Sequence, residues 1–191
     1  MKKKRASSLT VLAIGALLLS GCQATASESP TEAADQTSIE GPHLVAAGQV
    51  FDPVAQDVDN PEEACGSDAG RTELAEFDRV EWPDLGIDGG VGVMTCGNAA
   101  GAGFRHIADG HTGDFGEIAD LVDSSWEDVA WFAIDMALEA PSEVEMYRDD
   151  IANYLIVLEY VDEGGEVVQS WPVVVGVGLD TDHIITSFPR D

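Results

Sequence analysis

The segment that most constrains the fold is "SSWEDVAWFAIDMALEAPS", residues 124–142, which has the pattern of an amphipathic helix. Ser124 and Glu127 form a capping box at its start, and Pro141 ends the helical pattern. Between them, apolar side chains recur with the helical period and share one face: Trp126, Val129, Ala130, Ala133, Ile134 and Ala137. A helix with such a stripe has to pack against another layer of structure.

The residues after this helix predict strands. "YLIVLEYV", residues 154–161, and "VVQSWPVVVGVGL", residues 167–179, are rich in β-branched and aromatic side chains, and the turn sequence "DEGGE" separates them. "VGVMTC", residues 91–96, and "HIITSFP", residues 183–189, predict two further strands. This order predicts an α+β fold, with N-terminal helices packed on one face of a curved antiparallel sheet of about four strands.

Shorter helices are expected upstream. Pro61–Cys65 is one, "FRHIADGH" at residues 104–111 is a second that Gly110 closes, and "GDFGEIADLVD" at residues 113–123 is a third. "GNAAGAG", residues 97–103, is a glycine-rich loop without the Gly-Lys-Ser/Thr ending of a phosphate-binding loop.

The N-terminus carries a targeting pattern. The basic "MKKKR" precedes "LTVLAIGALLL", an apolar run too short for a comfortable membrane span. "LSGC", Leu19 to Cys22, resembles the lipobox of bacterial lipoproteins. The resemblance implies that residues 1–21 are a signal peptide and that Cys22 carries lipid, which would anchor the protein to the outer face of the bacterial cell membrane. The alternative is an ordinary signal peptide with a chance cysteine.

The remaining chain divides into two parts. Residues 22–43 are rich in Ala, Ser, Thr, Glu and Pro, which indicates a flexible acidic linker. Residues 44–191 are enough for a single α+β domain with its own core, and we expect a monomer. Outside the membrane thiols oxidise, so Cys65 and Cys96 are expected to form a disulfide.

The charge argues against ordinary nucleic-acid binding. Cleavage before Cys22 would leave five arginines and no lysine against 36 acidic residues, a formal net charge of −31. Such a surface repels polyanions at long range, whereas nucleic-acid binders usually present a basic patch. Any binding of RNA would therefore depend on a local site rather than on the overall field.

Two histidines five residues apart are the main candidates for chemistry. On a helix, His106 and His111 lie about 140° apart, whereas zinc-binding histidines on one face are four residues apart. Asp109 and Asp114 lie close by, but their spacing matches no calcium loop, so we expect no metal and no cofactor. Simpler roles stay open, since His106 could bond a core carbonyl and His111 could favour a helix C-terminus.

A histidine pair can also supply the general base and the general acid that metal-free cleavage of RNA requires. One imidazole removes the proton of the ribose 2′-hydroxyl and the other protonates the leaving oxygen. A cation and a hydroxyl would stabilise the phosphate in the transition state. Arg105 is the candidate cation, and Thr186 or Ser187 the candidate hydroxyl.

The order "TCGN…GFRHIADGH…SSWEDVAWFAIDMALEAPS…VVVGVG…HIITSFP", roughly residues 91–189, resembles secreted bacterial domains of the barnase, EndoU, colicin and RelE-like ribonuclease fold. The resemblance implies catalytic roles for His106 and His111, the hydroxyl role for Thr186, and a substrate-facing aromatic at Phe188. Thr186 and Phe188 share one strand face, with Ser187 on the other.

Two departures from that pattern qualify the expected activity. Phe188 stands where the family has a tyrosine, and the catalytic lysine of EndoU-type sites is absent. Arg105 or Arg148 is the candidate replacement, although a guanidinium differs from an ammonium in shape and hydrogen bonding. Three functions stay open: a ribonuclease-like enzyme that acts on RNA, a non-catalytic surface lipoprotein that binds a protein or ligand, and an acidic inhibitor that imitates nucleic acid and occupies a basic protein.

Overall fold

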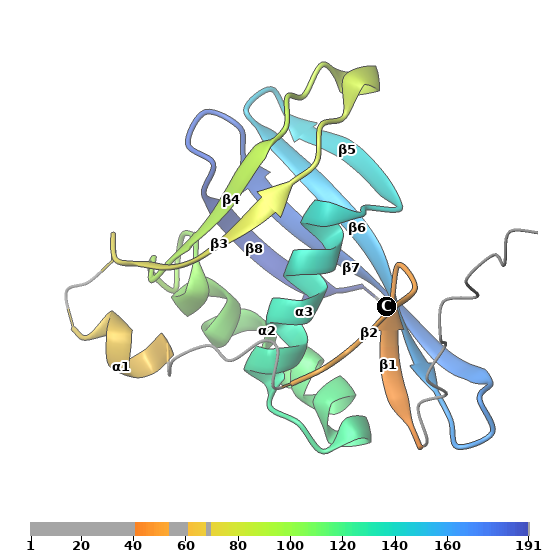
Figure 1. Ribbon diagram of the computed structural model, residues 1–191. Helices are drawn as coiled ribbons and strands as arrows, with labels where there is room; N and C mark the ends of the chain where they lie inside the picture. The colour runs from red at the N-terminus through yellow and green to blue at the C-terminus, as the bar shows by residue number, and fades with distance from the viewer. Residues whose placement is uncertain (1–40, 54–60, 68–69, 191) are drawn as a thin grey trace, which may run out of the picture. The chain divides into compact units, whose positions relative to one another are not determined.

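A computed structural model of the chain describes residues 41–53, 61–67 and 70–190 (Figure 1). The predicted signal peptide 1–21, Cys22 and all but the last three residues of the predicted linker 22–43 lie outside this part. The described residues belong to one of two structural units, Ser38–Asp191. None of the helices within these ranges has the length and apolar character needed to cross a membrane.

The order of elements is mixed, with strands on both sides of the main helices. The helices, short 3-10 turns and strands of the described residues are β1 (His43–Ala46), β2 (Gln49–Val50), α1 (Pro61–Cys65), β3 (Glu73–Arg79), η1 (Pro83–Leu85), β4 (Gly90–Thr95), α2 (Phe104–Ala119), η2 (Asp120–Val122), α3 (Trp126–Glu139), β5 (Glu143–Arg148), β6 (Ile151–Val161), β7 (Val167–Gly178) and β8 (Ile184–Pro189).

The main sheet has six antiparallel strands instead of the four expected. The long hairpin β6–β7 forms its centre, with β8 beside β7. The other edge of β6 pairs with two strands in succession, β5 along residues 151–155 and β1 along residues 158–161, and β2 pairs with β1. The additional strands β1, β2 and β5 were not predicted, because β1 and β2 have only four and two residues and β5, "EVEMYR", mixes Val and Tyr with glutamates that strands disfavour.

The predicted strand 91–96 exists as β4, but it belongs to a second sheet. β4 pairs antiparallel with β3 to form a two-stranded sheet. This sheet meets the main sheet where the backbone N–H of Val93 donates to the carbonyl of Asp182, just before β8.

Two helices, α2 and α3, pack side by side on the main sheet, as the α+β prediction required (Figure 1). The prediction for α2 was wrong in one respect, because Gly110 does not end it: one helix runs from Phe104 to Ala119. The glycines within α2 weaken a helix by about 1 kcal/mol each. Burial of the apolar face, which includes Ile107 and Phe115, offsets this cost.

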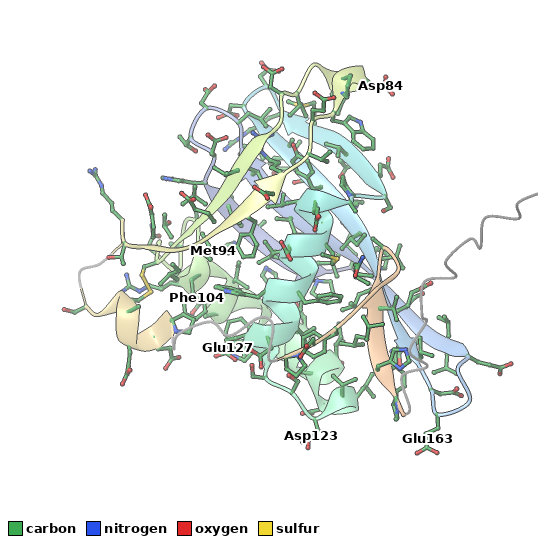
Figure 2. The ribbon with its side chains drawn as sticks, viewed as in Figure 1. Asp84, Met94, Phe104, Asp123, Glu127 and Glu163 are labelled. Carbon is green, nitrogen blue, oxygen red and sulfur yellow. A yellow bond between two sulfur atoms is a disulfide. The ribbon has the colours of Figure 1, made fainter. Side chains whose placement is uncertain are left out.

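The α3 helix is the centre of the core. Its cap lies one residue later than predicted, since Ser125 Oγ, not that of Ser124, accepts a hydrogen bond from the N–H of Asp128. The buried face of α3 contacts β3, β6, β7 and α2. Figure 2 shows Met94 and Phe104, both buried, near this helix, while acidic side chains such as Asp123 and Glu163 project from the outer turns.

A buried arginine joins the two sheets. Arg79 of β3 donates from Nη1 to the Tyr154 hydroxyl at 3.0 Å and to the Asp88 carbonyl at 2.9 Å. Its Nη2 pairs with Asp182 Oδ1 at 3.1 Å. Its side chain is 6% exposed, so these bonds satisfy a charge inside the protein.

The predicted disulfide is confirmed. Cys65, the last residue of α1, bonds to Cys96, directly after β4, with Cα atoms 5.4 Å apart. The bond closes a segment with a sequence separation of 31. It holds α1 next to the start of the loop that leads into α2.

Candidate functional site

A pocket of about 370 Å³ lies between the start of α2 and the strands β5 to β8. It opens on the sheet face opposite the core, because neighbouring strand residues point to opposite faces. Tyr154 and Val175 point into the core, whereas Asn153 and Gly176 line the pocket. The lining residues are His106, Glu145, Tyr147, Ile151, Asn153, Gly176, Ile185, Thr186, Phe188 and Arg190.

A glycine makes the floor hollow. Glu145, Asn153, Gly176 and Thr186 are paired neighbours in one row across β5, β6, β7 and β8. A Cβ atom on Gly176 would lie 3.3 Å from Cγ2 of Thr186 and 3.4 Å from Oδ1 of Asn153. Any larger side chain at residue 176 would therefore fill the space between its neighbours.

Two β-bulges shape the walls. The β5–β6 register shifts after Met146, so that Tyr147 is an extra residue, and the β7–β8 register shifts at Ile185 in the same way. A bulge leaves one residue unpaired and redirects its side chain. Both extra residues line the pocket, and the side chain of Tyr147, an exposed residue, forms part of its rim.

His106 enters the pocket from the first turn of α2. Its Nδ1 lies 3.0 Å from the carbonyl oxygen of Ala99. A carbonyl only accepts hydrogen bonds, so Nδ1 carries the proton, and in the neutral ring Nε2 keeps its lone pair. The loop before α2 thus sets the tautomer of His106.

His111 lies beside His106 without lining the pocket itself. The ring centroids are 6.1 Å apart, with the planes nearly perpendicular. His111 also stacks on Phe188 at 5.0 Å, and its Nδ1 donates to Asp114 Oδ2 at 3.0 Å. The two histidines therefore meet on a single helix, although their positions lie about 140° apart around it.

An ion pair spans one side of the pocket. Arg190 Nη2 lies 3.1 Å from Glu145 Oε1, and the side-chain amide of Asn153 donates to the same oxygen at 3.3 Å. The hydrogen bond from Arg190, and then that from Asn153, hold the pKa of the Glu145 carboxyl below its usual range. Glu145 is thus an anion that already has a cationic partner.

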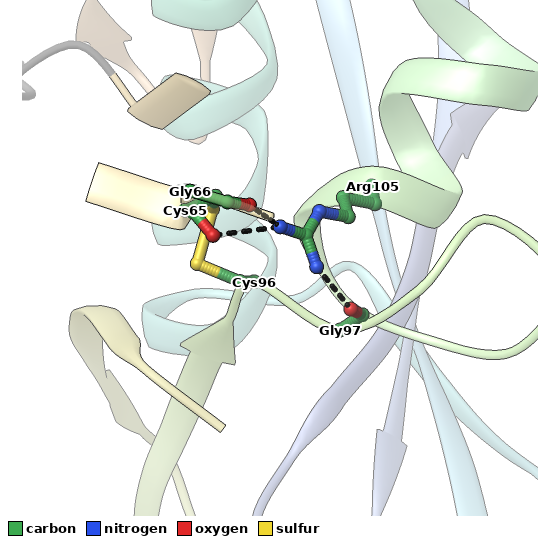
Figure 3. The surroundings of a disulfide bond; sticks show 5 residues. All are labelled: Cys65, Gly66, Cys96, Gly97 and Arg105. Atoms are coloured by element: carbon green, nitrogen blue, oxygen red, sulfur yellow. Dashed lines mark hydrogen bonds between the residues drawn. A yellow bond between two sulfur atoms is a disulfide. The ribbon is translucent and has the colours of Figure 1, made fainter. Parts of the chain in front are cut away.

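Three predicted residues lie elsewhere. The guanidinium of Arg105 binds the carbonyls of Cys65, Gly66 and Gly97 next to the disulfide (Figure 3). Arg148 pairs with Asp150 on the surface and does not line the pocket. Ser187 is fully buried on the opposite face of β8.

The structure brings the other predicted residues together. Thr186, Phe188 and His106 line one pocket, and His111 contacts two of them through its ring. Within the described part of the chain, Thr186 Oγ1 is buried and makes no hydrogen bond. A buried hydroxyl without a hydrogen-bond partner lowers the stability by about 1–3 kcal/mol. The Thr186 hydroxyl is therefore available to form a hydrogen bond with a ligand in the pocket.

Sequence reasoning missed the remaining pocket residues. Arg190 had a usable signal, because it continues the alternation of Thr186 and Phe188 along β8. Tyr147 and Ile185 had none, since a bulge shifts the register and cannot be read from alternation.

Over the described ranges, no three His, Cys, Asp or Glu side chains are grouped so that they could hold a metal ion. Comparisons of the chain with protein-family models, with curated proteins and with solved structures found no match.

Proposed function

We propose that this protein cleaves RNA by metal-independent acid–base catalysis at the pocket beside α2, while a lipid on Cys22 tethers it to the outer face of the membrane. One observation carries the proposal. His106 has its Nδ1 proton bound to Ala99, so its Nε2 lone pair is free in a pocket that Thr186 and Arg190 also line.

His106 and His111 divide the proton transfers. Nε2 of His106 takes the proton of the ribose 2′-hydroxyl, and the 2′-oxygen attacks the adjacent phosphorus. The bond from phosphorus to the 5′-oxygen breaks, and that oxygen takes a proton from the imidazolium of His111. The products are a 2′,3′-cyclic phosphate and a free 5′-hydroxyl. The carboxylate of Asp114, 3.0 Å from His111 Nδ1, accepts a hydrogen bond from this nitrogen and fixes the orientation of the ring, so that Nε2 makes the transfer.

Arg190 and Thr186 are the candidates for holding the phosphate. Arg190 replaces Arg105 in the role predicted for a cation, because it lines the pocket. Its fork can bind a phosphate oxygen while it keeps its contact with Glu145. Rotation of Thr186 about χ1 would turn its unbonded hydroxyl toward the same phosphate.

The charge of the lining residues allows this pocket to bind RNA even though the chain as a whole is acidic. Glu145 is the only carboxylate among them, and Arg190 neutralises it. The pocket is therefore locally neutral in a protein whose formal charge is −27 with the N-terminal basic residues included. Short single strands would approach more easily than long polyanions, since fewer phosphates meet the acidic surface.

Cleavage of a short fluorescent RNA in excess chelator tests the proposal. We expect wild-type protein to release a cyclic phosphate product, and His106→Ala to slow it at least about 100-fold, as for loss of a general base. His183→Ala, at an exposed histidine outside the pocket, is the matched control and should leave the rate unchanged. Cleavage that His106→Ala retains, or that the chelator abolishes, would contradict the proposal.

A second candidate is ligand binding without chemistry. It is favoured by the ion pair between Glu145 and Arg190, which offsets the charge that would stabilise a transition-state phosphate but leaves other N–H groups of Arg190 able to bind a ligand. The result that supports it is saturable binding of a mononucleotide, seen as shifts in the NMR signals of His106, with no cleavage of RNA.

A further inference from the structure

Arg105, the arginine beside the disulfide, belongs to a hydrogen-bond network that extends to His106. Arg105 Nη2 donates to the Cys65 carbonyl at 2.7 Å and also to that of Gly66, and Nη1 donates to the Gly97 carbonyl at 3.1 Å (Figure 3). The backbone N–H of Arg105 donates to the carbonyl of Cys96. Through its side chain and its backbone N–H together, Arg105 thus links the end of α1, both cysteines of the disulfide and Gly97.

These contacts hold the loop 97–103 at its first end. Gly97 N–H also donates to the Gly70 carbonyl at 2.9 Å, and its φ of +58° is a conformation that side chains rarely adopt. A Cβ on Gly97 would lie 1.7 Å from the Ala102 carbonyl oxygen, so the loop folds back tightly on itself.

The second end of the loop is held by the main sheet. Gly103 N–H donates to the Ile185 carbonyl at 3.0 Å, at the bulge of β8. Between the two ends, the N–H of Asn98 donates to the Ala102 carbonyl. Ala99, inside this closed segment, presents its carbonyl to Nδ1 of His106 at 3.0 Å.

We infer that Arg105 and the Cys65–Cys96 disulfide are positioning groups that fix the tautomer of His106 through the Ala99 carbonyl. If the loop moves, His106 Nδ1 loses its acceptor, and the proton can occupy Nε2 instead. A proton on Nε2 faces the pocket and removes the lone pair that a general base requires. Arg105 therefore acts at a distance from the substrate, and not as the cation that the sequence suggested.

The inference rests on the proposed function, because it explains how His106 keeps the tautomer that a general base requires. The test observes that tautomer directly and needs no RNA. The full chain is labelled with ¹⁵N-histidine, and the ring nitrogens of His106 are observed by NMR at alkaline pH, where histidine side chains are neutral. A His106→Gln sample assigns the signals. In the wild type we expect the proton on Nδ1 and the lone pair on Nε2.

Arg105→Met is the test variant. We expect it to shift the His106 signals from the Nδ1–H form to a mixture with the Nε2–H form. His111, whose Nδ1 is held by Asp114, should keep its tautomer and serves as the internal control. Arg148→Met removes an arginine that pairs with Asp150 at the surface, and it should change neither histidine.

A variant that does not fold is replaced by Arg105→Lys, which keeps the charge but cannot bridge all three carbonyls. The Cys65→Ser, Cys96→Ser double variant tests the contribution of the disulfide independently, and we expect it to shift the His106 tautomer in the same direction. An unchanged His106 tautomer in the folded variants overturns the inference, even if the protein cleaves RNA. A shifted tautomer supports it, even if no RNA is cleaved.

Discussion

Replacing the buried arginine between the two sheets should cost a large part of the stability. Arg79→Met keeps the apolar stem but removes the bonds to Tyr154, Asp88 and Asp182. The Tyr154 hydroxyl is buried and loses its partner, which costs about 1–3 kcal/mol. Asp182 is 45% exposed, so water replaces part of its ion pair and that loss is only about 1 kcal/mol. Asp88 is an exposed residue, so water can bond its carbonyl, and we expect a total of about 2–4 kcal/mol.

Urea unfolding followed by tryptophan fluorescence, to which the buried Trp131 contributes, measures this loss. A fall of about 2–4 kcal/mol corresponds to a decrease in Tm of roughly 10 °C for a domain of this size. Arg148→Met is the control, since both partners of its ion pair are more than half exposed and the pair contributes at most about 1 kcal/mol. If the two variants lose equal stability, Arg79 does not hold the sheets together and the reasoning fails.

Three further substitutions test the fold and the pocket. Burial, and then two nearby carboxylates, raise the pKa of Asp135, so the folded protein binds this proton more tightly than the unfolded chain and loses stability as the pH rises through the raised pKa. Asp135→Asn should therefore raise the Tm at neutral pH and lose this advantage in acid; a gain of equal size at both pH values would contradict the assignment. Glu145→Gln removes the carboxylate that pairs with Arg190, and we expect the KM for RNA to fall several-fold; an unchanged or higher KM would show that Arg190 does not bind the phosphate. Gly176→Val fills the floor next to Thr186, and RNA cleavage should fall at least tenfold while circular dichroism stays native; full activity would place the chemistry outside this pocket.

The parts of the fold that were predictable are those with strong local patterns. The apolar stripe of α3 and the β-rich hairpin β6–β7 are visible in single segments of sequence. The strand β5 could not be predicted in this way, because its six residues mix Val and Tyr with glutamates that strands disfavour, and its pairing with β6 decides the conformation. The break expected at Gly110 was wrong for the same reason, since tertiary packing of α2 outweighs the propensity of one glycine.

The site was predictable where alternation or helical position locates a side chain. His106, Thr186 and Phe188 were selected from the sequence and lie together in the structure. The position of the Arg105 side chain was not predictable, because adjacency to His106 in sequence says nothing about its direction, and it bonds the Cys65 carbonyl outside the pocket. Arg190 reaches the pocket instead, through the pairing of β8 with β7.

The most direct test of the central claim is to locate a bound RNA fragment on the protein. A 2′-deoxy dinucleotide lacks the attacking hydroxyl, so it binds without being cleaved, and NMR chemical shifts can map its position. We expect the largest changes at the His106 ring and at the backbone of Thr186 and Arg190, with a smaller change at Tyr147 on the rim. Changes confined to other surfaces, or none at saturating dinucleotide, would contradict the assignment of this pocket as the site of RNA cleavage.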